Sequence, residues 1–355
     1  MSYVSQRLPE GFGIAMTRAF FVLALVFFAC LGHAQTLLVG NKAAASVSLI
    51  DLARGQEVAR AKTQHGPHEI AVSGNGALAV VTNYGSPERP GNSLSVIEVE
   101  RAQTVATIEL SPHSRPHGIV FMPDNRHVLV TAEGTNSLLM VDIWKGEVTA
   151  VIPTGQRVSH MLAYDADAKR AYVANIGSGS VSLINVASRS LLSYQSSGAG
   201  AEGIALAPDR RHLWVANRAA DTVSLFDARY LDKLAEIVVP GFPIRAEALN
   251  NGTVLVTSAR SATLSVIAPE ARAVTRTIEI GLSKTTATIF GDAFAGSSVP
   301  IGIEVSPDGE RIWIAHAAAD AVQELEVGSW RQLRLLETGD EPDAMAFSAR
   351  QVKTP

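Results

Sequence analysis

The chain has 355 residues, of which 47% are hydrophobic and 18% are charged, and this composition predicts a globular protein with a sizeable core. Its formal net charge is −4 and its basic residues do not form runs, so we expect no nucleic acid among its partners. The length suits one large domain or two ordinary ones.

The N-terminal segment 1–34 is typical of a secretory signal peptide. Arg18 supplies a positive flank, Ala19–Leu31 forms an apolar core of 13 residues, and Gly32-His33-Ala34 places small residues where a signal peptidase cleaves. This core is too short to cross a bilayer, so we expect no membrane span after cleavage; a buried N-terminal helix or a membrane anchor is the alternative. Met16 stands just before Arg18 and the apolar core and is a second candidate for the start of translation.

The cysteine content fits export. Cys30 is the only cysteine, and Phe27-Phe28-Ala29 is a poor approach to a lipid attachment site. Cleavage after Ala34 leaves a mature chain without disulfides or thiolate chemistry. We therefore expect a periplasmic or secreted protein.

A repeated pattern runs through the rest of the chain in seven copies. Ala171–Val186 reads AYVANIGSGSVSLINV, and Leu213–Ala228 reads LWVANRAADTVSLFDA. Each copy predicts a first strand, a second strand after a short turn, a more polar third strand, and a fourth strand after a loop that contains Gly or Pro. The first strands end at Asn41, Asn83, Ala132, Asn175, Asn217, Ser258 and His316.

Repeats of this kind predict an all-β fold, a seven-bladed β-propeller whose blades are four-stranded antiparallel sheets. The mature chain begins on a first strand and ends just after Asp343–Ser348, which reads as a fourth strand. Three N-terminal strands and one C-terminal strand would then form a mixed blade that closes the ring. An open solenoid is the alternative, but its capping ends are not apparent. We place the propeller at residues 35–351 and a tail at 352–355.

Four stretches carry a resemblance to a known family: VVTN at Val80–Asn83, YVAN at Tyr172–Asn175, WVAN at Trp214–Asn217 and SPDG at Ser306–Gly309. They resemble the YVTN-type propeller repeat of secreted bacterial and archaeal proteins. The resemblance implies the propeller fold over the whole mature chain and supplies no catalytic residue. It extends loosely to seven-bladed lactonases.

One position of the repeat, at the start of the fourth strand, carries the most informative residues. Innermost strands line the central channel, so equivalent positions form a ring at one channel mouth. Aligning the copies places these residues in the ring: His68, His117, His160, Glu202, Arg245, Ile301 and Asp343. All but Ile301 are candidates for ligand binding.

Two interpretations of this ring remain open. Imidazole and carboxylate groups on neighbouring strands suit one divalent ion, Zn²⁺, Cu²⁺, Mn²⁺ or Fe²⁺, held by His68, His117, His160 and Glu202. Otherwise the ring is a polar channel mouth filled with water. For Arg245 we expect either a bidentate contact with a carboxylate or phosphate, or a structural ion pair with Glu202 or Glu247.

Two insertions are expected on the face that holds the ring, Ser86–Gly91 and roughly Leu282–Ser298. Long loops gathered on one face of a rigid scaffold commonly form a binding site. Further polar residues on this face are expected to be solvated loop residues: Lys42, Tyr84, Glu133, Arg218, Arg260 and His316.

These features favour a monomeric binding or scaffold protein that presents a site around the channel to a small molecule or a periplasmic protein. No nucleophile elbow or phosphate-binding loop is present in the sequence. The first alternative is a metal-dependent hydrolase resembling a lactonase, with Asp343 as the candidate base. The second is a redox accessory protein, although the chain lacks the Cys-x-x-Cys-His of a c-type haem.

Overall fold

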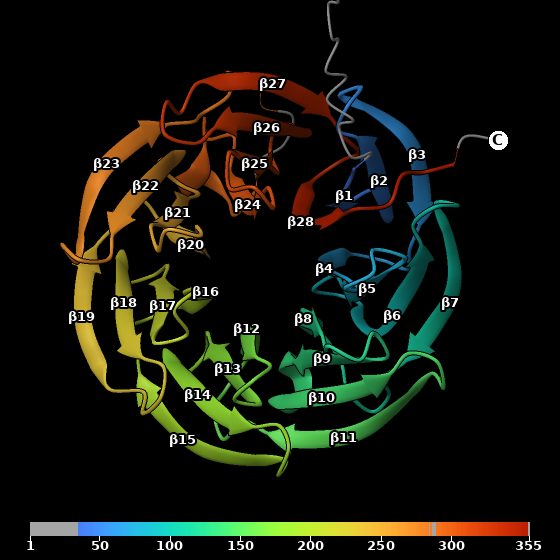
Figure 1. Cartoon of the computed structure of the whole chain (residues 1–355), viewed down its shortest axis with the longest axis horizontal. Coiled ribbons are helices and arrows are strands. Elements are labelled where there is room, and N and C mark those ends of the chain that lie inside the picture. The colour runs from blue at the N-terminus through green and yellow to red at the C-terminus, as the bar shows by residue number, and fades with distance from the viewer. Residues whose placement is uncertain (1–34, 284, 286–288, 354–355) are drawn as a thin grey trace, which may run out of the picture. The chain divides into compact units, whose positions relative to one another are not determined.

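Seven four-stranded antiparallel sheets form the described part of the chain, arranged as the blades of a closed ring (Figure 1). The computed structural model describes residues 35–283, 285 and 289–353. The expected signal peptide, residues 1–34, lies outside the described residues, as do the last two residues of the expected tail. The prediction of an all-β, seven-bladed propeller is confirmed.

Blade 1 joins the two ends of the described chain, because its strand order is β28-β1-β2-β3. The N-terminal strand β1 pairs on one side with β2 and on the other with the C-terminal β28. The predicted mixed blade is therefore present. Its strands are β1 (Thr36–Asn41), β2 (Ser46–Asp51), β3 (Gln56–Lys62) and β28 (Pro342–Ser348).

The other six blades each consist of four consecutive strands. Blade 2 has β4 (Pro67–Val72), β5 (Leu78–Gly85), β6 (Pro90–Glu98) and β7 (Gln103–Glu109). Blade 3 has β8 (Pro116–Phe121), β9 (His127–Ala132), β10 (Ser137–Asp142) and β11 (Glu147–Pro153), and blade 4 has β12 (Ser159–Asp165), β13 (Arg170–Asn175), β14 (Ser180–Asn185) and β15 (Ser190–Ser196).

Blade 5 has β16 (Ala201–Leu206), β17 (His212–Asn217), β18 (Thr222–Asp227) and β19 (Lys233–Val238). Blade 6 has β20 (Pro243–Ala248), β21 (Val254–Ser258), β22 (Thr263–Ala268) and β23 (Ala273–Glu279). Blade 7 has β24 (Pro300–Val305), β25 (Arg311–His316), β26 (Ala321–Glu326) and β27 (Gln332–Glu337). Two short 3₁₀ helices, η1 (Glu133–Thr135) and η2 (Asp292–Phe294), lie in loops.

The core lies between neighbouring blades. Strand side chains alternate between the two faces of a sheet, and every blade has a neighbour on each face. In β1, Leu37 packs with Trp313 of blade 7, whereas Leu38 packs with Val81 of blade 2. All six residues of β1 and of β2 are buried for this reason, whereas the outermost β3 has a single buried residue, Ala61.

The repeated Asn that ends many first strands is a scaffold residue. In blade 5, the Asn217 side-chain amide donates hydrogen bonds to Thr222 and Ser224, and its oxygen accepts one from Ser197. Asn41 donates in the same way to Ser46 and Ser48. The amide thus ties the first strand to the second and explains why the repeat pairs VAN with VSL.

Candidate functional site

The inner ring is the set of residues at the second position of the seven innermost strands. Strand pairing defines this position, because the first residue of each innermost strand pairs with the last or a nearby residue of the next strand, as Pro67 does with Asn83 and Pro243 with Ser258. A bulge follows in each case. The inner ring contains His68, His117, His160, Glu202, Ile244, Ile301 and Asp343.

The predicted place of Arg245 in this ring is wrong. Arg245 pairs with Thr257 one position beyond the ring, and Ile244 takes the ring position. The proline that begins β20 gives the correct alignment, because β4, β8, β24 and β28 also begin with proline. The ring therefore contains two apolar residues, Ile244 and Ile301, whereas only Ile301 was expected.

A second set of side chains surrounds the inner ring. Each of them directly follows the position at which the first strand of a copy was predicted to end, as Lys42 follows Asn41. We call these residues the outer ring. Each outer-ring N–H donates a hydrogen bond to the carbonyl of the residue that precedes an innermost strand, and that residue has a left-handed backbone conformation in every blade. The outer ring contains Lys42, Tyr84, Glu133, Ile176, Arg218, Ala259 and Ala317.

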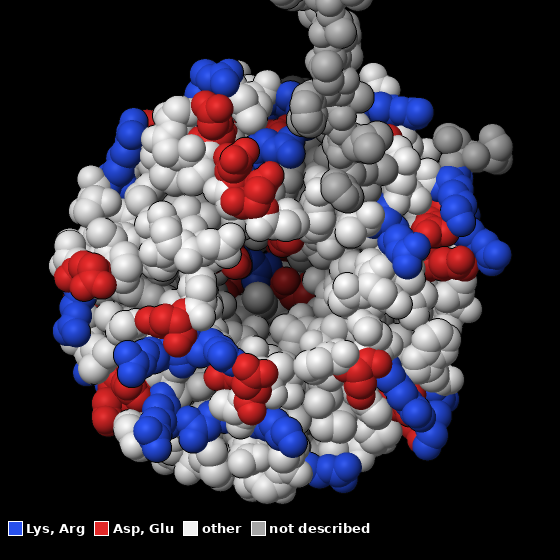
Figure 2. Space-filling model, in the orientation of Figure 1, with Lys and Arg blue, Asp and Glu red and all other residues white. Residues whose placement is uncertain are grey.

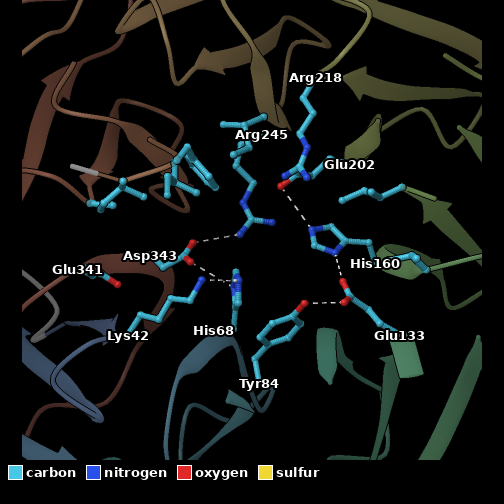
Figure 3. A pocket seen from close by; sticks show the side chains of 17 residues that line it. Lys42, His68, Tyr84, Glu133, His160, Glu202, Arg218, Arg245, Glu341 and Asp343 are labelled. Carbon is cyan, nitrogen blue, oxygen red and sulfur yellow. Dashed lines mark hydrogen bonds and ion pairs between the residues drawn. The ribbon is translucent and has the colours of Figure 1, made fainter. Parts of the chain in front are cut away.

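The two rings enclose a cavity of about 270 Å³ at the channel mouth (Figure 3). Four of its wall residues are carboxylates and three are lysine or arginine. Figure 2, seen from the other end of the channel than Figure 3, shows acidic and basic atoms deep in the central opening as well. The charged residues of the wall are Lys42, Glu133, Glu202, Arg218, Arg245, Glu341 and Asp343.

His160 is the centre of a buried hydrogen-bonded chain in blades 2 to 5. Its Nδ1 contacts Glu133 Oε1 closely, while Tyr84 donates to the other oxygen of Glu133 over 2.6 Å. The His160 Nε2 atom lies 3.4 Å from Glu202 Oε1, and Arg218 lies 2.6 Å from Glu202 Oε2. Burial lowers the pKa of His160, but the hydrogen bonds to Glu133 and Glu202 outweigh it and raise the pKa above its ordinary value.

On the other side of the cavity, His68 contacts groups of both charges. Its Nε2 lies 3.3 Å from Lys42 Nζ, and its Nδ1 lies 3.2 Å from Asp343 Oδ2. Burial raises the pKa of Asp343, yet the charges of His68, Lys42 and Arg245 together hold it below its ordinary value. Asp343 is therefore ionised at neutral pH, as is the hydrogen-bonded Glu133, whose pKa is also lowered.

His117 lies between the other two histidines and is 1% exposed. Its ring centroid is 4.0 Å from that of His68 and 3.5 Å from that of His160. Neither of its ring nitrogens has a hydrogen-bond partner in the described part of the chain. Burial, reinforced by the neighbouring histidines, holds its pKa well below the ordinary value, so the imidazole is neutral.

Arg245 closes the channel beneath the inner ring. Its guanidinium contacts Glu69 Oε1 closely and lies 3.6 Å from Asp343 Oδ1. Glu69, on β4, was missed by the sequence reasoning, and the structural ion pair expected with Glu202 or Glu247 forms instead with Glu69 and Asp343. The signal is visible in hindsight, because the equivalent positions in four other blades are Gly118, Gly203, Gly302 and Ala344.

The remaining wall of the cavity is apolar. Ile244 and Ile301 of the inner ring lie beside Ile289 and Phe290, which come from the second insertion. Phe290 is 47% exposed and contacts the rings of Phe242 and Phe294. The first insertion contributes no wall residue to this cavity; its carbonyls at Ser86 and Pro87 accept hydrogen bonds from Arg115.

The expectation of solvated loop residues is wrong for five of the six named residues. Lys42, Tyr84, Glu133 and Arg218 form part of the cavity wall. Arg260 is exposed and pairs with Asp221, as expected for a surface residue. His316 is fully buried and contacts Ser298, with its pKa lowered to about 4 by burial.

Two groups of three side chains in the described part of the chain bring nitrogen and oxygen atoms within 4.8 Å of one another, close enough to share a metal ion. One is His68, Glu69 and His117; the other is His117, Glu133 and His160. His68 and His160 fall into different groups, and Glu202 belongs to neither. The four ligands expected to share one ion are thus not brought together as a single set.

Comparisons with known proteins agree with the fold. The described chain is a seven-bladed β-propeller, and a sequence model of the YNCE-like beta-propeller family matches residues 157–291, in agreement with the YVTN-type resemblance. No curated protein matches the chain.

Solved structures of several propellers superpose on most of the chain. A functionally unknown protein from Desulfotomaculum acetoxidans DSM 771 does so with a TM-score of 0.72 and 13% identity, covering 88% of this chain and 98% of that one. The periplasmic gluconolactonase PpgL of Pseudomonas aeruginosa has a TM-score of 0.68 and 13% identity, with 88% and 99% covered. The dihydro-heme d1 dehydrogenase NirN, in complex with DHE, has a TM-score of 0.63 and 13% identity, with 88% and 75% covered. At such identities the likeness concerns the fold alone.

In the described part of the chain, no helix has the length and apolar character needed to cross a bilayer.

Proposed function

We propose that the channel mouth binds a small, uncharged organic molecule that has an apolar part and a carbonyl or similar hydrogen-bond acceptor. The observation that carries this proposal is the division of the cavity into two unlike walls. Ile244, Ile289, Phe290 and Ile301 offer an apolar surface, and His160 and Lys42 offer N–H groups on the other side. Small-molecule sites commonly combine apolar walls with a few placed polar groups.

The charges of the wall argue against a strongly anionic ligand. Arg218 already pairs with Glu202, and Arg245 pairs with Glu69. An incoming carboxylate or phosphate would have to displace one of these buried partners, which would leave a carboxylate uncompensated. A neutral acceptor avoids that penalty because it needs only one or two hydrogen bonds from groups that retain their charge partners.

The fold comparisons support a small-molecule role without naming the ligand. Two of the propellers with a similar fold are a gluconolactonase and a dehydrogenase in complex with DHE. Because a fold hosts many functions, they serve here only as precedents for small molecules handled by proteins of this fold. The periplasm or the cell exterior is the proposed location, and a monomer is the proposed state.

Hydrolysis of the bound molecule is a second candidate function. The buried pair of His160 and Glu133 favours it, because a carboxylate that holds one imidazole nitrogen orients the other for proton transfer. His160 lines the cavity, and its Nε2 lies 3.4 Å from Glu202 Oε1 on the side away from Glu133. A lactone bound against the apolar wall would present its carbonyl to this atom.

The test uses γ-lactones with alkyl tails of increasing length, and gluconolactone as the polar comparison. Isothermal titration calorimetry of the full chain should show affinity that rises with tail length, and Phe290→Ala should remove about 1–3 kcal/mol of that gain. Tyr194→Ala, an exposed aromatic on β15, is the matched control and should change nothing. Affinity independent of the tail, or equal effects of the two variants, would refute the proposal. Release of hydroxy acid, followed by pH-stat titration, decides whether hydrolysis accompanies binding.

A further inference from the structure

The buried imidazole of His117 has no assigned role in ligand binding, because His117 does not line the cavity. Both of its nitrogens are buried without a hydrogen-bond partner among the described residues. A buried polar atom left without a partner destabilises a folded protein, so nearly all such atoms in proteins have one. A neutral imidazole with a free lone pair is also the commonest metal ligand in proteins.

The atoms around His117 supply the other ligands of a metal site. His160 Nδ1 and Glu133 Oε1 contact each other closely, and with His117 they form the group whose donor atoms lie within 4.8 Å of one another. All three residues are buried. Two imidazoles and one carboxylate form a donor set that suits Zn²⁺ and related divalent transition metals.

The surroundings of these residues resemble the outer shell of a metal site. Tyr84 donates a hydrogen bond to Glu133 Oε2, which fixes the orientation of the carboxylate. Glu202 lies beside His160 Nε2 and adds negative charge. Such hydrogen bonds to ligand side chains usually accompany metal binding and strengthen it. The excess of carboxylates over cationic side chains in the adjoining wall also favours a bound cation.

The second group, His68, Glu69 and His117, is the weaker candidate. Arg245 contacts Glu69 Oε1 directly, so the only carboxylate of that group is already neutralised. A metal ion there would also stand beside the guanidinium and be repelled by it. The side chain of Glu133 has no lysine or arginine among its hydrogen-bond partners in the described chain, since its carboxylate bonds only to the side chains of Tyr84 and His160.

We propose that His117, His160 and Glu133 bind one divalent transition-metal ion, with Zn²⁺ as the best-suited ion. Three protein ligands leave at least one coordination position for water or for a ligand from the adjoining cavity. The site differs from the one expected from the sequence, because Glu133 replaces Glu202 and His68 is not a ligand. His160 must release the proton of its ligating ring nitrogen when the ion binds, as imidazole ligands do.

The test is titration of the metal-free full chain with ZnCl₂ alone, followed by calorimetry, and with CoCl₂, followed by visible absorption. We expect one ion per chain, and d–d bands of four-coordinate Co²⁺. Glu133→Gln should weaken binding at least 10-fold, and His117→Ala should abolish it. Glu69→Gln, the matched carboxylate of the competing group, and His113→Ala, a loop histidine bonded to Thr135, should keep binding within 2-fold.

The outcomes separate cleanly. The proposal is overturned if the unmodified chain binds neither Zn²⁺ nor Co²⁺. It is also overturned if Glu69→Gln loses metal binding while Glu133→Gln keeps it. Circular dichroism of each variant shows whether it is folded, and Glu133→Gln retains a test if His117→Ala does not fold. Because no organic ligand is added, the result does not depend on the proposed binding of lactones.

Discussion

At the scale of single residues, the channel below the inner ring holds carboxyl groups in an unusual environment. Glu247 on β20 and Glu304 on β24 line a second, deeper cavity together with Glu69 and Arg245. Burial raises the pKa of Glu247 to about 7 despite the nearby charge of Arg245. Burial and the charge of Glu247 raise the pKa of Glu304 well above its ordinary value.

Glu247→Gln should therefore change the pH dependence of stability. In the unfolded chain, the carboxyl group of Glu247 ionises near its ordinary pKa of 4.5, whereas in the folded protein its pKa is about 7. Rising pH between these two values therefore lowers the free energy of unfolding of the parent protein. The variant cannot ionise and should gain about 1–3 kcal/mol relative to the parent as pH rises from 4.5 to 7.5.

Urea unfolding of both proteins at pH 4.5, 6.0 and 7.5 provides the measurement. Glu310→Gln, an exposed position in the turn before β25, is the matched control for the loss of a carboxylate at the surface. The free energies of unfolding of Glu247→Gln and the parent could instead differ by the same amount at all three pH values. That result would show that the carboxyl group of Glu247 is not buried as described.

The site residues also show how far sequence reasoning reaches at this scale. Six of the seven inner-ring positions follow from the repeat alone, because equivalent positions of a repeat are equivalent in space. Arg245 was misplaced because its register depends on a bulge, and the shared proline was not used to align it. Glu133 and Tyr84 were missed as wall residues because their solvent exposure depends on how far neighbouring blades lean together, which spacing does not determine.

At the scale of elements, the innermost strands approach one another most closely at the position after the inner ring. A Cβ atom added at Gly302 would lie 2.0 Å from the Asp343 carbonyl oxygen of β28, and one at Gly203 would lie 2.6 Å from the Ile244 carbonyl of β20. Only glycine fits where two backbones are this near. The close approach brings the inner-ring side chains of adjacent blades into contact.

Gly302→Ala should accordingly destabilise the propeller by about 1–3 kcal/mol, because the added methyl group forces β24 away from β28. Gly40→Ala in β1 is the matched control, since its added Cβ would meet its nearest neighbour, Ile70 Cδ1, at an ordinary 3.5 Å. Chemical denaturation of the two variants is the measurement. Equal stabilities would mean that the innermost strands are not packed as tightly as described.

The elements themselves were predicted well. Each copy of the repeat contains four strands in the expected order, because the alternating apolar pattern and the Gly, Pro, Asn and Asp turns define them locally. The insertion before β24 was expected on the ring face, and its Ile289 and Phe290 do reach the cavity. That these two side chains turn inward could not be predicted, since a loop has no periodicity to indicate which face is buried.

At the scale of the whole molecule, the mixed blade predicts a strict requirement for the C-terminal strand. Removal of residues 343–353 deletes most of β28 and exposes the edge of β1, along with the faces of β4 and β24 that contact β28. We expect loss of the cooperative thermal transition and aggregation, because an open edge pairs with other chains. Size-exclusion chromatography and circular dichroism test this. A chain that ends at Val352 is the control and should remain monomeric and folded.

The pairing of β1 with β28 also dictates the order of folding. The Thr36 hydroxyl donates a hydrogen bond to the Arg350 carbonyl, 314 residues away in sequence. Contacts of such separation form late and slowly, because a very long loop must close before they stabilise the chain. During synthesis the first blade therefore stays incomplete until the last strand has left the ribosome. A propeller built in this way keeps an open ring for as long as its own synthesis lasts.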